Sequence, residues 1–387
     1  NSGYMTGDIK GAWLSDTDTT NVVGTVPFAD NMSSDTTSNW SGFYDSLTFS
    51  TDHFNLQRVI GHGRAKVAIT GLVSGETYVI TAKVKAVGSS QNVQIGVTNG
   101  SFSQTEVSSY TVGTSDYTEI SHSYTHGSMT HATIWNTTTS SNVDWKDWEV
   151  RLADADRSVN GNGLAVHGTI TKTAVATGAD LVGYGNFSTT RRLAQPYNSD
   201  LDFGNTMSFM LWLKDPLSGT NIFDKGTRYT NHSFGLYVDG GHDPRFYCSS
   251  NGTTDQMFEI PRTTSLTGWN LICFTMESGV VKGYLNGALE VTGTFTGGNL
   301  FVNSSELKIG VGSVSSTAWP SDMALALLRI SATAPTAAQI LEIYNAEKPL
   351  FQENAECTLN GSSDAVQCLA YDDSTELLHV GTSGGRS

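Results

Sequence analysis

The sequence has 387 residues, of which 38% are hydrophobic and 15% charged, with 40 glycines but only 8 prolines. This composition indicates many short strands joined by Gly and Asn turns, and it excludes a disordered chain, which would carry fewer aromatic residues and more charge. The formal net charge of −15 argues against nucleic acid and anionic membranes as partners, because an acidic surface repels phosphate groups.

The first element in chain order is a short apolar strand within residues 1–25, followed by a Thr/Asp-rich linker. We predict that residues 1–25 form an N-terminal strand and linker segment.

Membrane insertion is not expected anywhere, because the longest apolar run, "MALALL" at 323–328, is far too short to cross a bilayer.

Residues 26–153 form a first block rich in strand signals. In "TYVITAKVKAV", Tyr78, Ile80 and Ala82 alternate with more polar residues, which is typical of an antiparallel strand with one buried face. Packing two such sheets face to face buries all of these alternating strands. This block is predicted to be a β-sandwich.

Residues 154–349 form a second β-rich block that ends in the only convincing helix. Thr336 followed by Gln339 fits a capping box, and Ile340 and Ile343 begin an apolar stripe before Pro349. We predict a second antiparallel sandwich closed by this helix, so the fold class is all-β with two sandwich or jelly-roll domains in tandem.

The tail, residues 350–387, contains one strand, an Asp-rich turn, a second strand and a Gly-rich exit. It is predicted to be a β-hairpin. A single β-unit needs a partner, which could be the N-terminal strand, sequence beyond residue 387 or another subunit.

The second block resembles the LamG-like, concanavalin A-like jelly roll. The resemblance rests on ordered motifs, namely "MSFMLWLKDP", "GLYVDGG", "GWNLICFTMESGVVKGYLNGALE", "LKIGVGS" and the closing "ISATAPTAAQILEIYN". It covers about half of the chain and implies a lectin-like fold.

The first block is similar to carbohydrate-binding-module sandwiches through "FADNMSSDTTSNWSGFY" and "DWKDWEV", and the tail resembles a fragment of a propeller blade. All three together resemble the modular adhesins of phage tail fibres and tailspikes. That resemblance implies a virion or extracellular location, a cell-surface glycan as ligand, and other virion subunits or further copies of this chain as partners. Fold alone does not determine function.

Sugar binding requires flat aromatic faces beside amides and carboxylates. In "NWSGFYD", Trp40, Phe43 and Tyr44 stand among polar residues and are predicted to form a binding platform. The alternative is that Trp40 plugs one end of the sandwich.

Two further tryptophans are candidates for sugar binding. Strict alternation in "NVDWKDWEVRL" puts Trp148 inward and Trp145 outward. Trp319 stands in the loop "SSTAWPSD". We predict that Trp145 and Trp319 are exposed.

A structural calcium ion is a weaker expectation, and no other cofactor is expected. The carbohydrate-binding-module resemblance would place its ligands at Asp30 and Asp147.

The sequence favours a non-enzymatic, glycan-binding adhesin. Two alternatives stay open: a tailspike-type glycan hydrolase or lyase, and a purely structural spacer. The E-x-D-x-E strand usual in concanavalin-like hydrolases is missing, so hydrolysis would require Glu119, Glu149 and Glu290 to meet in three dimensions.

Overall fold

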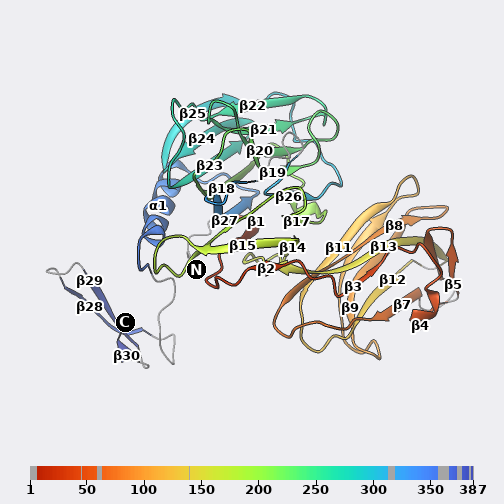
Figure 1. Ribbon diagram of the computed structural model, residues 1–387. Coiled ribbons are helices and arrows are strands. Elements are labelled where there is room, and N and C mark those ends of the chain that lie inside the picture. The colour runs from red at the N-terminus through yellow and green to blue at the C-terminus, as the bar shows by residue number, and fades with distance from the viewer. Residues whose placement is uncertain are drawn as a thin grey trace.

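The computed structural model describes residues 7–44, 46–58, 63–138, 140–312 and 319–355, together with the tail strands at 366–372, 377–382 and 385–386 (Figure 1). All strand pairings in these ranges are antiparallel, which confirms the all-β class. None of the described helices has the length and apolarity needed to cross a membrane.

The first sandwich packs a five-stranded sheet, in the order β10-β9-β12-β7-β4, against a sheet built on β11-β8-β13. Strands β3 and β6 pair with β13, and β5 pairs with β6. Side chains from both sheets form one buried core, as the alternation predicts. The elements are β3 (Phe28–Asp30), η1 (Thr37–Asn39), β4 (Trp40–Phe43), β5 (Ser46–Ser50), β6 (His53–Arg58), β7 (Gly63–Ala68), β8 (Thr77–Ala86), β9 (Gln91–Thr98), β10 (Thr105–Val112), β11 (Thr118–Thr125), β12 (His131–Asn136) and β13 (Ser141–Asp154).

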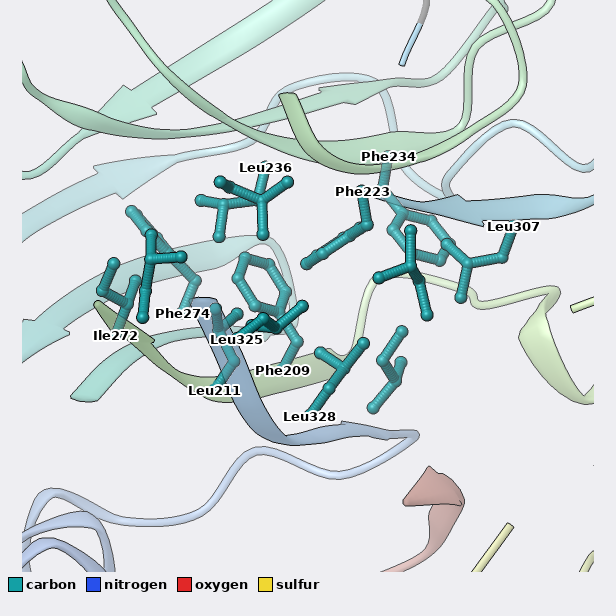
Figure 2. Close-up of a cluster of buried hydrophobic side chains, with 14 of the residues drawn as sticks. Phe209, Leu211, Phe223, Phe234, Leu236, Ile272, Phe274, Leu307, Leu325 and Leu328 are labelled. Carbon is teal, nitrogen blue, oxygen red and sulfur yellow. The ribbon is translucent and has the colours of Figure 1, made fainter. Parts of the chain in front are cut away.

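The second domain is a jelly roll in which two larger sheets enclose an aromatic core (Figure 2). At its centre, the ring of Phe209 lies 5.0 Å from that of Phe223 and 5.2 Å from that of Phe246. The strands are β14 (Leu164–His167), β15 (Thr169–Ala174), β16 (Val182–Gly185), β17 (Arg192–Gln195), β18 (Met207–Lys214), β19 (Thr220–Lys225), β20 (Phe234–Val238), β21 (Pro244–Ser249), β22 (Asp255–Glu259), β23 (Trp269–Glu277), β24 (Val280–Leu285), β25 (Ala288–Thr294), β26 (Leu307–Ile309) and β27 (Ala324–Ser331).

The N-terminal segment belongs to the jelly roll. Strand β1 (Ile9–Trp13) pairs with β27, and β2 (Val22–Val23) pairs with β15. The first sandwich is therefore inserted between β2 and β14. In the described structure β1 pairs with β27, whereas the tail strands pair with one another, so the option that the N-terminal strand pairs with the tail is not what the structure shows.

One sheet runs through both domains. The long strand β13 pairs with β8 in the sandwich and with β14 at the start of the jelly roll, giving a 13-stranded sheet from β11 to β22. Hydrogen bonding between strands therefore fixes the two domains to each other (Figure 1).

Asp154, the last residue of β13, ties this junction together. Its carboxylate accepts hydrogen bonds from the Tyr184 hydroxyl at 3.0 Å and from the Leu14 backbone N–H at 3.4 Å. Burial raises the pKa of Asp154 to about 6, although both hydrogen bonds oppose the shift.

We expect Asp154→Asn to raise the Tm at neutral pH. The folded chain holds the Asp154 proton more tightly than the unfolded chain, so wild-type stability falls as pH rises through about 6. The neutral amide escapes that loss. Thermal unfolding across this pH range should show the gain above pH about 6 and its disappearance towards pH about 4; a gain independent of pH would contradict the assignment.

The predicted helix is present as α1 (Ala337–Glu347). Thr336 is its N-cap, and the reciprocal hydrogen bonds with Gln339 form the expected capping box. Ile340 and Ile343 are buried, as the apolar stripe predicts. Two short 3-10 helices complete the jelly roll, η2 (Ser199–Leu201) and η3 (Lys348–Phe351).

In the tail, β28 (Val366–Asp372) and β29 (Leu377–Thr382) pair antiparallel as the predicted hairpin, and β30 (Gly385–Arg386) adds to β29.

Candidate functional site

Three of the five predicted sugar-binding residues lie inside the protein. The exposed fractions of Trp40, Trp145 and Trp319 are 4%, 0% and 5%. The prediction that they offer exposed stacking faces is wrong.

Trp40 and Trp319 are held by aromatic contacts. The ring of Trp40 packs edge-on against Trp148 at 5.3 Å, which agrees with the alternative that it plugs the sandwich. Trp319 packs against Phe187 at 4.7 Å, and its indole N–H donates to the Asn221 carbonyl at 3.3 Å. Both rings therefore contribute to the core.

Trp145 is buried because β13 contains a β-bulge. Where β8 advances by two residues, β13 advances by three, from Lys146 to Glu149. Asp147, inside the bulge, has a φ of 51°. The extra residue reverses the alternation, so Trp145 and Trp148 both point into the core, 6.2 Å apart.

Phe43 is the predicted residue that remains on the surface, with 53% of it exposed, whereas Tyr44 is half-buried against the sandwich core. Trp40 points inward from β4, so Phe43, three residues later, points outward. Phe43 therefore stands on the outer face of the five-stranded sheet.

A row of side chains crosses that outer face. Phe43 pairs with Arg64, Arg64 with Trp135, Trp135 with Gln94, and Gln94 with Ser109. Residues directly opposite on neighbouring strands share a face. We call Phe43, Arg64, Trp135, Gln94 and Ser109 the aromatic row.

Aromatic rings surround the guanidinium of Arg64. Its central carbon lies 5.0 Å from the ring centroid of Phe43, 5.1 Å from that of Trp135 and 4.4 Å from that of Phe102 in a neighbouring loop. Such cation–π contacts fix the side chain. Its Nε–H is buried and has no hydrogen-bond partner among the described residues.

The other end of the row is polar. Gln94 donates from Nε2 to the Ser109 hydroxyl at 3.0 Å, while its buried Oε1 has no partner within the described structure. The Trp135 indole N–H donates to the Thr133 hydroxyl at 3.0 Å. The row thus joins aromatic surface to one donor and one acceptor that lack a hydrogen-bond partner among the described residues. Aromatic surface beside hydrogen-bonding groups is the combination that binds a sugar ring.

Sequence reasoning missed Arg64, Trp135 and Gln94. In "HATIWN" the alternation with buried Ile134 puts Trp135 outward, and this signal was available. The side chains that stand beside it depend on strand register, which the sequence does not specify.

A groove of about 460 Å³ lies where the continuous sheet passes from one domain to the other. Strands of the sandwich contribute Lys83, Glu149 and Arg151, and strands of the jelly roll contribute His167 and Arg192. We call it the interdomain groove.

Two of the three glutamates considered for hydrolysis lie in the same groove, and the third does not. Glu119 and Glu149 both line the interdomain groove, whereas Glu290 lies on β25 in an ion pair with Arg262 at 2.6 Å. Glu306 is the third glutamate of the groove. Glu290 therefore does not join Glu119 and Glu149 in the same groove.

Asp30 and Asp147, the predicted calcium ligands, have separate partners. Asp30 accepts hydrogen bonds from the Met32 N–H and the Thr36 hydroxyl, and Asp147 pairs with Lys83 at 2.9 Å. In the described ranges no group of three or more acidic, histidine or cysteine side chains gathers as a metal site would require. A calcium ion at this position stays a prediction.

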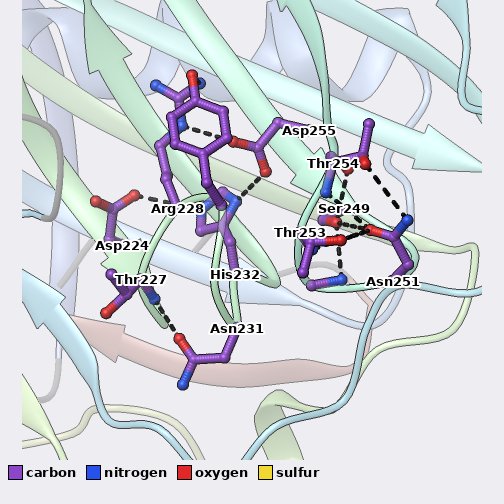
Figure 3. Close-up of polar contacts among 12 residues, drawn as sticks. Asp224, Thr227, Arg228, Asn231, His232, Ser249, Asn251, Thr253, Thr254 and Asp255 are labelled. Atoms are coloured by element: carbon purple, nitrogen blue, oxygen red, sulfur yellow. Dashed lines mark hydrogen bonds and ion pairs between the residues drawn. The ribbon is translucent and has the colours of Figure 1, made fainter.

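The jelly roll contains a buried charge network (Figure 3). His232 contacts Asp255 at 2.7 Å and Asp224 at 3.4 Å, and Asp255 also accepts from Arg228 at 2.7 Å. Burial alone would lower the pKa of His232, but the two carboxylates raise it above the ordinary value. The opposite charges attract one another, so the network attaches the segment between β19 and β20, which carries Arg228 and His232, to Asp224 on β19 and Asp255 on β22.

Residues 187–341 match the concanavalin A-like lectin/glucanase superfamily (Laminin_G_3). This segment is the body of the jelly roll. A search of curated proteins found no match to the sequence.

Solved structures with similar folds include domain 4 of AbnA, a GH43 extracellular arabinanase from Geobacillus stearothermophilus, in complex with arabinotriose. It is 20% identical, with a TM-score of 0.40, over 49% of this chain and 92% of that one. Botulinum neurotoxin type C is 17% identical, with a TM-score of 0.39, over 50% and 48%. The binding domain of Paraclostridial Mosquitocidal Protein 1 is 11% identical, with a TM-score of 0.43, over 59% and 61%. The chain thus spans about half to three-fifths of these two toxin structures.

Proposed function

We propose that this chain is a non-enzymatic, glycan-binding adhesin module and that the aromatic row is its binding face. The observation that carries the proposal is the unbroken line from exposed Phe43 through Arg64 and Trp135 to Gln94 on one outer sheet face. The superfamily match of the jelly roll supports it independently.

The chemistry of the row suits a sugar. The apolar C–H face of a pyranose stacks on an aromatic ring, and hydroxyls satisfy the open Arg64 Nε–H and Gln94 Oε1. Each contact is small, so binding per site is weak and depends on multivalent display.

The finer proposal is a phage tail fibre or a related receptor-binding protein that displays the module on a virion or outside a cell. The combination of an inserted sandwich, a jelly roll and a terminal hairpin supports it. Its partners are then cell-surface glycans and further subunits or copies of the fibre. A spacer would have no use for an exposed aromatic row.

We expect Trp135→Ala to weaken glycan binding about tenfold, because it removes a stacking surface that contributes roughly 1–2 kcal/mol. Phe43→Ala should act in the same direction and perturb folding less, since Phe43 is more than half exposed. Calorimetric titration of the full chain and of each variant, with the glycans that bind on an array, measures both changes in affinity.

Tyr229→Ala is the matched control, because Tyr229 is 65% exposed on the jelly roll, away from the row. It should bind as wild type does. Unchanged affinity in both row variants, with folding confirmed by thermal unfolding, would overturn the assignment of this face.

A further inference from the structure

The interdomain groove concentrates charge in a sparsely charged chain. Four of the 22 Lys and Arg residues and three glutamates line this one cavity of about 460 Å³. The aromatic row lies on the other sheet of the sandwich, so the groove is a separate surface.

Two arginines and a histidine come together in the groove. In the strand register, Arg192 of β17 lies opposite His167 of β14. Arg151 also reaches β14, where its side chain donates to the Val166 carbonyl at 3.2 Å. Burial and the charges of Arg192 and Arg151 lower the pKa of His167 to about 3. His167 is therefore neutral at pH 7 and adds no charge beside the two guanidinium groups.

Both arginines retain unused donors. The Nε–H groups of Arg151 and Arg192 are buried and have no hydrogen-bond partner among the described residues. Arg151 also pairs with Glu149, while the contact of Arg192 with Glu306 is long, at 3.9 Å. Guanidinium N–H donors bind a carboxylate more strongly than they bind a neutral acceptor.

Three glutamates line the same groove beside these bases. Glu119 stands opposite Lys83, whose ammonium is already paired with Asp147. Burial and the charges of Glu306 and Glu149 raise the pKa of Glu119. Carboxylate oxygens accept hydrogen bonds from hydroxyls, so the glutamates offer acceptors to a sugar.

We propose that the interdomain groove binds a carboxylated sugar, its carboxylate on Arg151 and Arg192 and its hydroxyls on Glu119 and Glu149. A neutral sugar would offer the two unpaired Nε–H groups only uncharged acceptors, and an inorganic anion would gain nothing from the glutamates. The proposal deepens the glycan-binding function and rests on it for the class of ligand, but it uses residues of both domains.

The test titrates the full chain by calorimetry with two carboxylated probes, trigalacturonate and 3′-sialyllactose. The matched neutral probes are carboxyl-reduced trigalacturonate and lactose. We expect at least one acidic probe to bind about tenfold or more tightly than its neutral counterpart, since charge-assisted hydrogen bonds are worth more than neutral ones. Which probe binds separates uronic acids from sialic acids as the source of the carboxylate.

Arg192→Gln and Arg151→Gln, on different strands, should each remove about tenfold of that affinity. The control Lys282→Gln deletes the same charge at an exposed position on β24 and should have no effect. Trp135→Ala should leave acidic-probe binding intact, which separates failure of the groove from failure of the aromatic row. No binding of either acidic probe, equal binding of the neutral probes, or no effect of the two arginine variants would each overturn the proposal.

Discussion

Glu347→Ala should lower the free energy of unfolding by about 3–5 kcal/mol, because it removes one partner of a buried ion pair. Glu347 is fully buried at the end of α1, and its carboxylate contacts the Arg329 guanidinium at 2.6 and 2.9 Å. It also accepts the Trp212 indole N–H at 2.8 Å. One side chain thus joins α1 to β27 and β18.

Chemical denaturation measures the loss. Glu342→Ala is the matched control, since Glu342 is exposed on the same helix, and it should change stability by about 0.5 kcal/mol at most. Glu347→Gln keeps the shape and removes the charge, so it should fall between the two. A loss below about 1 kcal/mol for Glu347→Ala would mean that the pair is not buried as described.

Trp13→Ala should cost about 3–5 kcal/mol, the range for truncating a large buried aromatic. Trp13 is 1% exposed within the jelly-roll core, and its indole N–H donates to the Asn162 carbonyl at 2.7 Å. Its ring lies over Gly11, where an added Cβ would meet it at 2.0 Å. The N-terminal strand is therefore part of the jelly roll.

Two measurements check this placement. Thermal unfolding should show a large loss for Trp13→Ala, a smaller one for Trp13→Phe and almost none for Val23→Ala, since Val23 is 56% exposed. In the Trp13→Ala variant, backbone amides of β27, the partner of β1, should exchange hydrogen faster than they do in the wild type. Wild-type stability and unchanged exchange in β27 would contradict the insertion of the sandwich into the jelly roll.

Local patterns in the sequence predicted local structure well. Alternation identified the inward residues of β8, and the Thr336–Gln339 capping box identified the start of α1. Both signals depend on residues close in the chain, where the periodicity of strands and helices applies directly.

Features that depend on strand register or on the pairing of distant segments could not be predicted from the sequence. A single bulge at Asp147 turned Trp145 inward, and alternation alone cannot reveal an extra residue. The pairing of β1 with β27 joins opposite ends of the chain. The aromatic row likewise needs β4, β7 and β12 in register before Phe43, Arg64 and Trp135 become neighbours.

The most direct test of the central claim is a glycan array on the purified chain, with reducing-end release monitored on every hit. We expect binding to at least one glycan, without release of reducing ends, and loss of that binding when Phe43 and Trp135 are both replaced by alanine. Release of reducing ends from a bound glycan would contradict it and direct attention to Glu119 and Glu149 in the interdomain groove. Absence of binding to any glycan would instead favour a spacer.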